Sequence, residues 1–351
     1  MSFGVYVHIP FCASRCDYCA FATWTDRHHL AADYLDSCRV DLERALAQRP
    51  RPVTSVFVGG GTPTQVDPHQ LGAVLDVIPL AEGAEVTVEC NPDDVTVELL
   101  AALRAHRVNR VSLGVQSMDP EVLQALGRWH DPASVQRAVD AIGSVGFASF
   151  NLDLIYGASG ESLSQWERTL TAAMALDPPH ISAYGLTVEA GTPLASQSLR
   201  WPDDDDQADK YELADEMLGA SGLDNYEVSN WARPGHESVH NRLYWAQGDY
   251  VGVGCAAHSH EAGRRWWNVR TPERYIDLVR AGLPSEASAE VLDAETRRIE
   301  GLQLALRTRE GVPRGVLPDD GLDGFVESRG ERVVLTRRGR LMANEVSLRL
   351  R

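Results

Sequence analysis

Three cysteines lie within one short segment near the start of the chain, with the spacing C-x3-C-x2-C at Cys12, Cys16 and Cys19. This spacing is tight enough for a single loop to wrap around an iron–sulfur cubane, which normally takes four thiolates. With three thiolates one iron keeps an open position, which a bidentate amino-acid ligand can fill. We therefore predict a [4Fe–4S] cluster with one free iron. The alternatives are a zinc site with a distant fourth ligand, or unrelated buried thiols.

A glycine-rich segment, Gly59–Thr64, follows an apolar run. Glycines at such a position let backbone amides and carbonyls approach a ligand that side chains would exclude. The segment is not a phosphate-binding loop, because no Gly-Lys-Ser/Thr follows. On its own it would more often be a tight turn. Beside a cluster loop, we expect Gly60, Gly61 and Thr62 to hold the amino group of a methionine moiety.

Four polar side chains further along the chain suit a larger cofactor: Glu89, Gln116, Arg128 and Asp153. A zwitterionic, ribose-bearing cofactor such as S-adenosylmethionine needs carboxylates for its hydroxyls or ammonium, an amide for its ribose and a guanidinium for its carboxylate. We therefore predict that these residues bind S-adenosylmethionine at the free iron. Each has a structural alternative, since a carboxylate at a strand end can be satisfied within the fold and Arg128 can cap a helix.

Short β-rich runs alternate with helical patterns through about the first 190 residues. The predicted strands are Val5–Ile9, Val53–Val58, Glu85–Glu89, Arg110–Val115, Phe150–Ile155 and His180–Leu186. The predicted helices include Leu30–Ala47, Pro68–Ile78, Val95–Ala105, Pro132–Val145 and Leu163–Ala175. Parallel strands with crossover helices follow, and six such units are too few for a closed eight-fold barrel. The predicted fold class is α/β, a partial six-unit (β/α) barrel.

The candidate cluster-binding and cofactor-binding residues lie near the ends of these predicted strands. From the first strand to the sixth, the residues at or just beyond the ends are Cys12–Cys19, Gly59–Thr64, Glu89, Gln116, Asp153 and Tyr184. In α/β barrels the site is built from the carboxyl ends of the strands and the loops that follow them. We therefore predict that these six residues and segments lie on one face of the partial barrel.

Residues beyond about 200 follow other patterns, and we expect three parts, 1–200, 201–285 and 286–351. The acidic run Asp203–Asp206 caps a helix through about Ala220, and short aromatic β-like segments run from Tyr226 to Val269. From about Asp293 come an amphipathic helix, turns, the strand Val333–Leu335 and a last helix from about Arg337. We expect a small winged-helix-like appendage there.

Charge and composition limit the function classes. The net charge of −17 repels phosphate backbones and argues against nucleic acid as a partner. No run approaches the 18 or so apolar residues of a membrane span and no signal peptide is apparent, so we expect a cytoplasmic protein whose clustered thiols are metal ligands. Arginines gather after residue 328, either as a solvated tail or as a contact for an anionic partner or a peripheral membrane surface.

Several motifs together resemble the radical S-adenosylmethionine proteins of the coproporphyrinogen-oxidase-like group. They are Tyr6–Cys19, Gly59–Pro63, Glu89–Pro92, Arg110–Ser117, Leu126–His130, Asn151–Gly157 and Tyr226–Asn230. The resemblance runs over nearly the whole chain and implies a six-unit partial barrel with the cofactor on its open face. It also brings Tyr6 into the set of cofactor-binding residues. The chain departs from the family pattern at Ala158–Gly160, in a loop expected near the cofactor.

Two branches of that group compete. The anaerobic coproporphyrinogen III oxidases typically carry a fourth cysteine two residues after the third, and a longer segment before the loop. Here Phe21 stands at that position, and the motif begins a few residues from the start. Both departures favour the haem chaperone branch, the HemW family, which implies haem, a recipient apo-haemoprotein and an electron donor as partners. A radical enzyme acting on an unknown small molecule is the third reading.

The segment His240-Asn241-Arg242-Leu243-Tyr244-Trp245 fits the HNxxYW pattern that the chaperone branch is thought to use for haem. Imidazole is a usual axial ligand of haem iron, and aromatic rings such as Tyr244 and Trp245 can stack on the macrocycle. The alternative is that His240 orders a loop and the aromatic rings are core. The run Gly254–Ser259 departs from the family pattern, and Cys255 within it is a rival ligand to His240.

Overall fold

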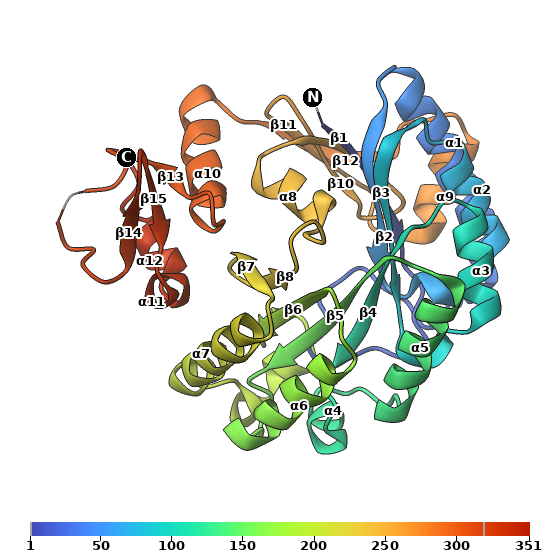
Figure 1. Ribbon diagram of the computed structural model, residues 1–351. Coiled ribbons are helices and arrows are strands. Elements are labelled where there is room, and N and C mark those ends of the chain that lie inside the picture. The colour runs from blue at the N-terminus through green and yellow to red at the C-terminus, as the bar shows by residue number, and fades with distance from the viewer. Residues whose placement is uncertain (1, 319) are drawn as a thin grey trace.

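Six parallel strands form the centre of the fold in the computed structural model, which describes residues 2–318 and 320–351. In sheet order they are β1 (Phe3–Ile9), β2 (Val53–Gly60), β3 (Leu80–Cys90), β4 (Arg110–Gln116), β5 (Ser149–Tyr156) and β6 (His180–Gly185). The helices between them are α1 (Ala31–Ala47), α2 (Pro68–Asp76), α3 (Val97–Ala105), α4 (Pro120–Ala125), α5 (Pro132–Val145) and α6 (Leu163–Ala175). Figure 1 shows α1, α2, α3 and α5 along one side of the curved sheet. All the strands and helices predicted for this half are present.

Later residues extend this sheet at both edges. Beside β1 lie β9 (Asp249–Val253), β10 (His258–Glu261), β11 (Arg264–Asn268) and β12 (Glu286–Val291), and beside β6 lie β8 (Asn230–Ala232) and β7 (Asp224–Glu227). Within the described residues this gives 12 strands whose end members, β12 and β7, do not pair with each other. The sheet is therefore open, as predicted for a partial barrel.

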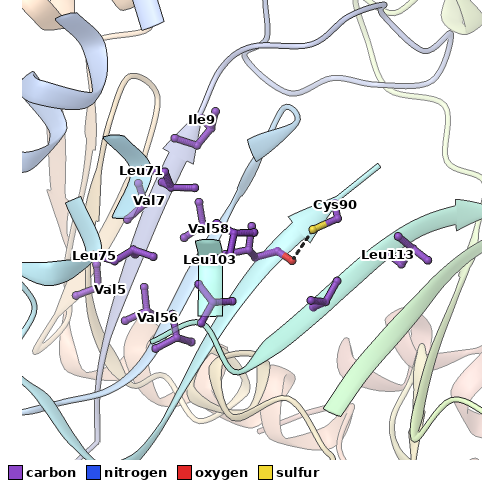
Figure 2. Packing of buried hydrophobic residues seen from close by; sticks show 14 of the residues in the cluster. Val5, Val7, Ile9, Val56, Val58, Leu71, Leu75, Cys90, Leu103 and Leu113 are labelled. Carbon is purple, nitrogen blue, oxygen red and sulfur yellow. Dashed lines mark hydrogen bonds between the residues drawn. The ribbon is translucent and has the colours of Figure 1, made fainter. Parts of the chain in front are cut away.

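The core between the sheet and its helices is aliphatic. Figure 2 shows Val5, Val7 and Ile9 of β1 and Val56 and Val58 of β2 beside Leu71 and Leu75 of α2 and Leu103 of α3. Near-continuous apolar strands are typical of parallel sheets, whose interior strands are covered on both faces. Burying one such side chain contributes about 1.5–3 kcal/mol, so this packing fixes the strand ends that carry the polar residues.

Local capping explains where the helices begin. Asp67 accepts hydrogen bonds from the amides of His69 and Gln70 at the start of α2, and Thr96 accepts one from Leu99 at the start of α3. A side-chain acceptor at this position satisfies an amide that has no partner within the helix. Because Thr96 is the cap, α3 starts at Val97, two residues after the predicted start.

The middle region differs from the prediction. The helix α7 (Asp204–Ala220) begins after its cap Asp203, as expected. The β-like pattern is wrong for Val239–Trp245, which forms the helix α8, and the helix α9 (Pro272–Arg280) was not predicted. Ser238 explains the first difference, because its hydroxyl accepts a hydrogen bond from the Asn241 amide and caps the helix.

The last residues have a core of their own. They form α10 (Ala294–Leu306), β13 (Val312–Pro313), β14 (Val326–Arg329), β15 (Arg332–Leu335), α11 (Arg337–Leu341) and α12 (Ala343–Ser347), and Figure 1 shows them beside the large sheet. Leu306, Val312 and Val346 are buried within this group. Strand β12 instead pairs with β11 in the large sheet. The three-part division stays a proposal, with β12 joined to the sheet.

Short 3-10 turns complete the elements: η1 (His28–Leu30), η2 (Pro63–Gln65), η3 (Pro92–Asp94), η4 (Leu194–Ser196) and η5 (Ser198–Arg200). Among the described residues, no helix is both long enough and apolar enough to span a bilayer.

Candidate functional site

A cavity of about 580 Å³ opens where the parallel strands end. It is lined by residues from every predicted strand end, among them Cys12, Cys16, Cys19, Gly60, Gly61, Thr62, Glu89, Gln116, Arg128, Asp153 and Tyr184. Parallel strands point their carboxyl ends to one edge, so residues as distant in sequence as Cys12 and Tyr184 meet there. Tyr6 is the exception among the predicted cofactor-binding residues: it faces a second cavity, and its hydroxyl pairs with Nδ1 of His8 at 3.0 Å.

The cysteine loop is closed at its base by backbone hydrogen bonds. The amide of Trp24 donates to Pro10 O at 2.7 Å, and the amide of Cys12 donates to Trp24 O at 3.1 Å. Within the loop, Sγ of Cys12 accepts from the Thr62 hydroxyl at 3.6 Å, and Sγ of Cys16 accepts from Nη1 of Arg128 at 3.5 Å. The loop therefore holds its thiols toward a hydroxyl and a guanidinium.

These thiols fit an iron–sulfur cluster. All three are free, and burial raises the pKa of Cys12 and of Cys19, so iron rather than solvent would have to stabilise their thiolates. No three His, Cys, Asp or Glu side chains of residues 2–318 and 320–351 converge on a single metal ion. In a cubane each thiolate binds a different iron, whereas all the ligands of a zinc site must meet at one ion. Thiols that do not converge on a single point therefore suit a cubane better than a zinc ion.

The glycine segment is locked against the cysteine loop. The amide of Gly61 donates to Ile9 O at 2.7 Å and the amide of Thr62 donates to Phe11 O at 2.8 Å. A Cβ atom on Gly61 would lie 2.7 Å from both of those carbonyl oxygens, so only glycine allows this approach. The amides of Gly61 and Thr62 are therefore used within the fold, and carbonyl oxygens are what the segment can offer a ligand.

Two carboxylates face the same cavity. Glu89 accepts a hydrogen bond from the Gly60 amide at 3.1 Å, and burial together with the nearby Asp153 raises its pKa to about 8. Asp153 accepts from the Ser112 hydroxyl at 2.7 Å and from Nδ2 of Asn151 at 2.8 Å. Burial raises the pKa of Asp153, and these hydrogen bonds oppose the rise. Two half-buried carboxyl groups in one cavity, of which Asp153 raises the pKa of Glu89, favour a cationic ligand.

The side chain of Arg128 does not cap a helix, although its backbone amide donates to Leu123 O at 2.8 Å at the end of α4. Its Nη2 donates to Gly114 O at 2.8 Å and to Oδ1 of Asn91 at 3.3 Å, which holds the guanidinium over the end of β4. At that end Gln116 has a φ of 62°, where non-glycine residues are uncommon, and the pairing of β4 with β5 shifts between Gly114 and Gln116. This bulge turns the strand end toward the cavity.

A second cavity of about 740 Å³ adjoins the first, and both are lined by Ala20, Phe21, Gly60 and Glu89. Aromatic and imidazole rings make up much of its wall: Tyr6, His8, Phe57, His240, Tyr244, Tyr250, His258 and Trp267. No motif in the sequence singles out Phe57, Tyr250, His258 or Trp267. The pairing of β1 with both β2 and β9, and of β10 with β11, brings them together, and no local motif reports such pairing.

Only some of the predicted haem residues line this cavity. His240 and Tyr244 lie on one face of α8, as residues four apart do, whereas Trp245 is not in the cavity lining. His240 is buried, its Nδ1 pairs with the Ser55 hydroxyl and its Nε2 with the Tyr244 hydroxyl, both at 2.9 Å, and burial lowers its pKa to about 3. Cys255 is also outside the lining: it is buried against Tyr34, and burial raises its pKa to about 12.

A family profile and similar proteins from bacteria agree on the family to which this chain is related. The radical SAM superfamily profile matches residues 6–173. A protein of Mycobacterium tuberculosis named heme chaperone HemW is 41% identical over 98% of this chain and 93% of its own length. The Bacillus subtilis protein of the same name is 33% identical over 98% of this chain and 97% of its own length.

Among solved structures, the coproporphyrinogen III oxidase HemN from Escherichia coli, described as a radical SAM enzyme, superposes with a TM-score of 0.86. It is 23% identical, and the match covers 99% of this chain and 89% of HemN, so this likeness shows the fold alone. The two near-full-length relatives show the family. The chain belongs to the haem chaperone HemW family.

Proposed function

We propose that this protein is a radical S-adenosylmethionine haem chaperone, which binds haem and transfers it to apo-haemoproteins. The observation that carries the proposal is the pair of adjoining cavities, one lined by three free thiols and the other by aromatic rings. The first cavity suits a cluster with its cofactor, in agreement with the radical SAM profile, and the second suits a flat apolar macrocycle, in agreement with the names of the relatives.

In the first cavity Cys12, Cys16 and Cys19 would hold a [4Fe–4S] cluster, which supplies an open iron position and electrons for cleaving S-adenosylmethionine. Arg128, already beside Cys16, would bind the cofactor's carboxylate. Glu89 and Asp153 would accept from its ammonium or ribose hydroxyls, and Gln116 from the ribose. The carbonyl oxygens of Gly60–Thr62 would meet the amino group, since the amides of Gly61 and Thr62 are already used.

The second cavity would hold haem. Tyr6, Phe57 and Tyr244 offer apolar ring faces, and His240 lies behind them in the same wall. Burying aromatic surface against a macrocycle supplies affinity without a covalent bond. Tyr6 therefore moves, in this proposal, from the S-adenosylmethionine site to the haem site.

The main alternative is coproporphyrinogen III oxidase activity. Phe21 speaks against it, because this side chain stands where that branch carries an extra cysteine, is 65% exposed and lines both cavities. A phenyl ring there can contact a macrocycle but cannot ligate iron. Radical chemistry on another small molecule is the remaining alternative.

The proposed partners are haem, a recipient apo-haemoprotein and an electron donor, in the cytoplasm. A peripheral membrane contact through the arginine tail has less support, because Arg337 and Arg340 both form ion pairs with Asp215 at 2.6 Å. Arg338 lies over the ring of Phe325. These side chains are engaged within the fold.

The test uses anaerobically reconstituted protein. One sample receives haem and then an apo-haemoprotein, and another receives coproporphyrinogen III with S-adenosylmethionine and a reductant. The proposal expects near-stoichiometric haem binding, recovery of haem absorbance by the recipient and no protoporphyrinogen. Protoporphyrinogen formation at enzymatic rates, or no haem binding, would refute it.

A further inference from the structure

Three histidines line the second cavity, and they differ in what their ring nitrogens contact. His8 pairs through Nδ1 with the Tyr6 hydroxyl and through Nε2 with Ala22 O, both at 3.0 Å. His240 pairs through both nitrogens with Ser55 and Tyr244. To ligate iron, either ring would have to give up a hydrogen bond in a buried setting, which is unfavourable.

His258 is the exception. It is exposed, and neither ring nitrogen forms a hydrogen bond with any residue of 2–318 or 320–351. Its ring stacks on that of Trp267 with the centroids 5.7 Å apart and the planes at 25°. The two residues are also direct partners in the pairing of β10 with β11. The imidazole is therefore supported on one face and free at both nitrogens.

The backbone before His258 is tightly fixed. A Cβ atom on Gly252 would lie 2.1 Å from His258 O, and Ala256, which lines the cavity, has a φ of 56°. Such close approach and left-handed backbone hold the start of β10 in one position. The imidazole is thus presented from a rigid strand.

Arg270 completes the arrangement. It lines the same cavity, is exposed and forms no ion pair within the described part of the chain. A free guanidinium at the edge of an aromatic cavity suits a carboxylate, and haem carries two propionates. The cavity thus combines aromatic walls, an available imidazole and an available cation.

We propose that haem binds in the second cavity with His258 as the iron ligand and Arg270 pairing with a propionate. The inference rests on the proposed function, because it assumes that haem is the cargo. His240 then acts as a positioning residue, which holds Tyr244 and the wall of the cavity through its hydrogen bond. The HNxxYW segment would contribute ring surface rather than the bond to iron.

The experiment titrates ferric haem into the full-length reconstituted protein and records difference absorption spectra and electron paramagnetic resonance. The variants are His258→Ala, His240→Ala and Arg270→Gln. The matched control is His69→Ala. His69 lies on the distant helix α2, is exposed like His258, and packs beside the imidazole ring of His106. Imidazole is then added to each haem-loaded variant.

We expect His258→Ala to weaken haem binding tenfold or more and to lose the imidazole-type spectrum, which added imidazole restores. Arg270→Gln should weaken binding severalfold with the spectrum unchanged, and His69→Ala should match the wild type. His240→Ala should keep the imidazole-type spectrum even where affinity falls.

If His258→Ala keeps the wild-type spectrum, or if His240→Ala alone loses it, the ligand assignment is wrong while haem binding stands. A wild-type protein that binds no haem would instead refute the proposed function itself. The two failures are therefore distinguishable.

Discussion

Glu89 should lose a proton when S-adenosylmethionine binds. Its pKa is raised to about 8 by burial and by the neighbouring Asp153, so at pH 7 it is protonated in the protein without the cofactor. In the proposed site the ammonium of the cofactor would bring a positive charge beside this pair of carboxyl groups. An opposite charge within a few ångströms lowers a carboxyl pKa by about 1–3 units, which leaves Glu89 about half ionised at pH 7 for a fall of 1 unit and almost fully ionised for a fall of 3 units.

The size of the effect follows from that pKa. A group with a pKa of about 8 is roughly nine-tenths protonated at pH 7 and half protonated at pH 8. A fall of about 3 units on binding should therefore release about 0.9 proton from Glu89 at pH 7 and about 0.5 at pH 8, whereas a fall of about 1 unit should release about 0.4 at either pH. Because a proton leaves, cofactor affinity should rise with pH over this range.

The same shift sets the sign of the stability change in the protein without the cofactor. The folded pKa lies above the ordinary carboxyl value of 4.5, so this contribution to stability is complete below about pH 4.5 and is lost as the pH rises through about 8. Glu89→Gln, which can keep the hydrogen bond from the Gly60 amide, should flatten this dependence in urea unfolding.

The assay is calorimetry of cofactor binding in phosphate and in Tris, whose ionisation enthalpies differ. The slope of observed enthalpy against buffer enthalpy counts the released protons. The amino group of the cofactor can also lose a proton, so the difference between wild type and Glu89→Gln is the decisive quantity. Equal slopes for the two proteins at pH 7 would show that the reasoning about Glu89 is incorrect.

Three further predictions concern the first cavity. The triple variant with Cys12, Cys16 and Cys19 changed to Ala should lose its brown colour and iron, and near-stoichiometric iron and sulfide on analysis would contradict the ligand assignment. Asp153→Ala should weaken S-adenosylmethionine binding by about tenfold or more in calorimetry, because a hydrogen-bonding partner of a charged ligand is removed; unchanged affinity would refute this role. Gly61→Ala should lower the free energy of unfolding by about 1–3 kcal/mol and reduce cluster loading, because its Cβ meets Ile9 O and Phe11 O at 2.7 Å; wild-type values of both would show that the loop adapts freely.

The sequence predicted the first cavity well because its residues follow directly from local patterns. Strand periodicity and helix caps fix where each strand ends, and parallel pairing then brings Glu89 and Asp153 to the same edge. The alternation of strands and helices was enough to predict that these two carboxyl groups lie at the same edge of the sheet. The fold of the first half was predictable for the same reason.

The second cavity was not predictable in this way. The partner of His240, Ser55, lies 185 residues away, and no local signal reports that both imidazole nitrogens are used. Cys255 is buried because β9 pairs with β1 and sets it against Tyr34, which the motif alone cannot show. The aromatic spacing of Val239–Trp245 resembles a strand, and the cap at Ser238 decides for a helix.

The wall that the two cavities have in common has a thermodynamic consequence. Ala20 and Phe21 follow the last cysteine of the loop directly and line both spaces, so a ligand that moves this short stretch changes the free energy of binding on its other side. Such coupling is reciprocal: a tenfold gain in haem affinity caused by one occupant requires an equal gain for that occupant when haem is bound. Removal or chemical change of the ligand in the first cavity can then lower haem affinity in the second cavity and so promote haem release.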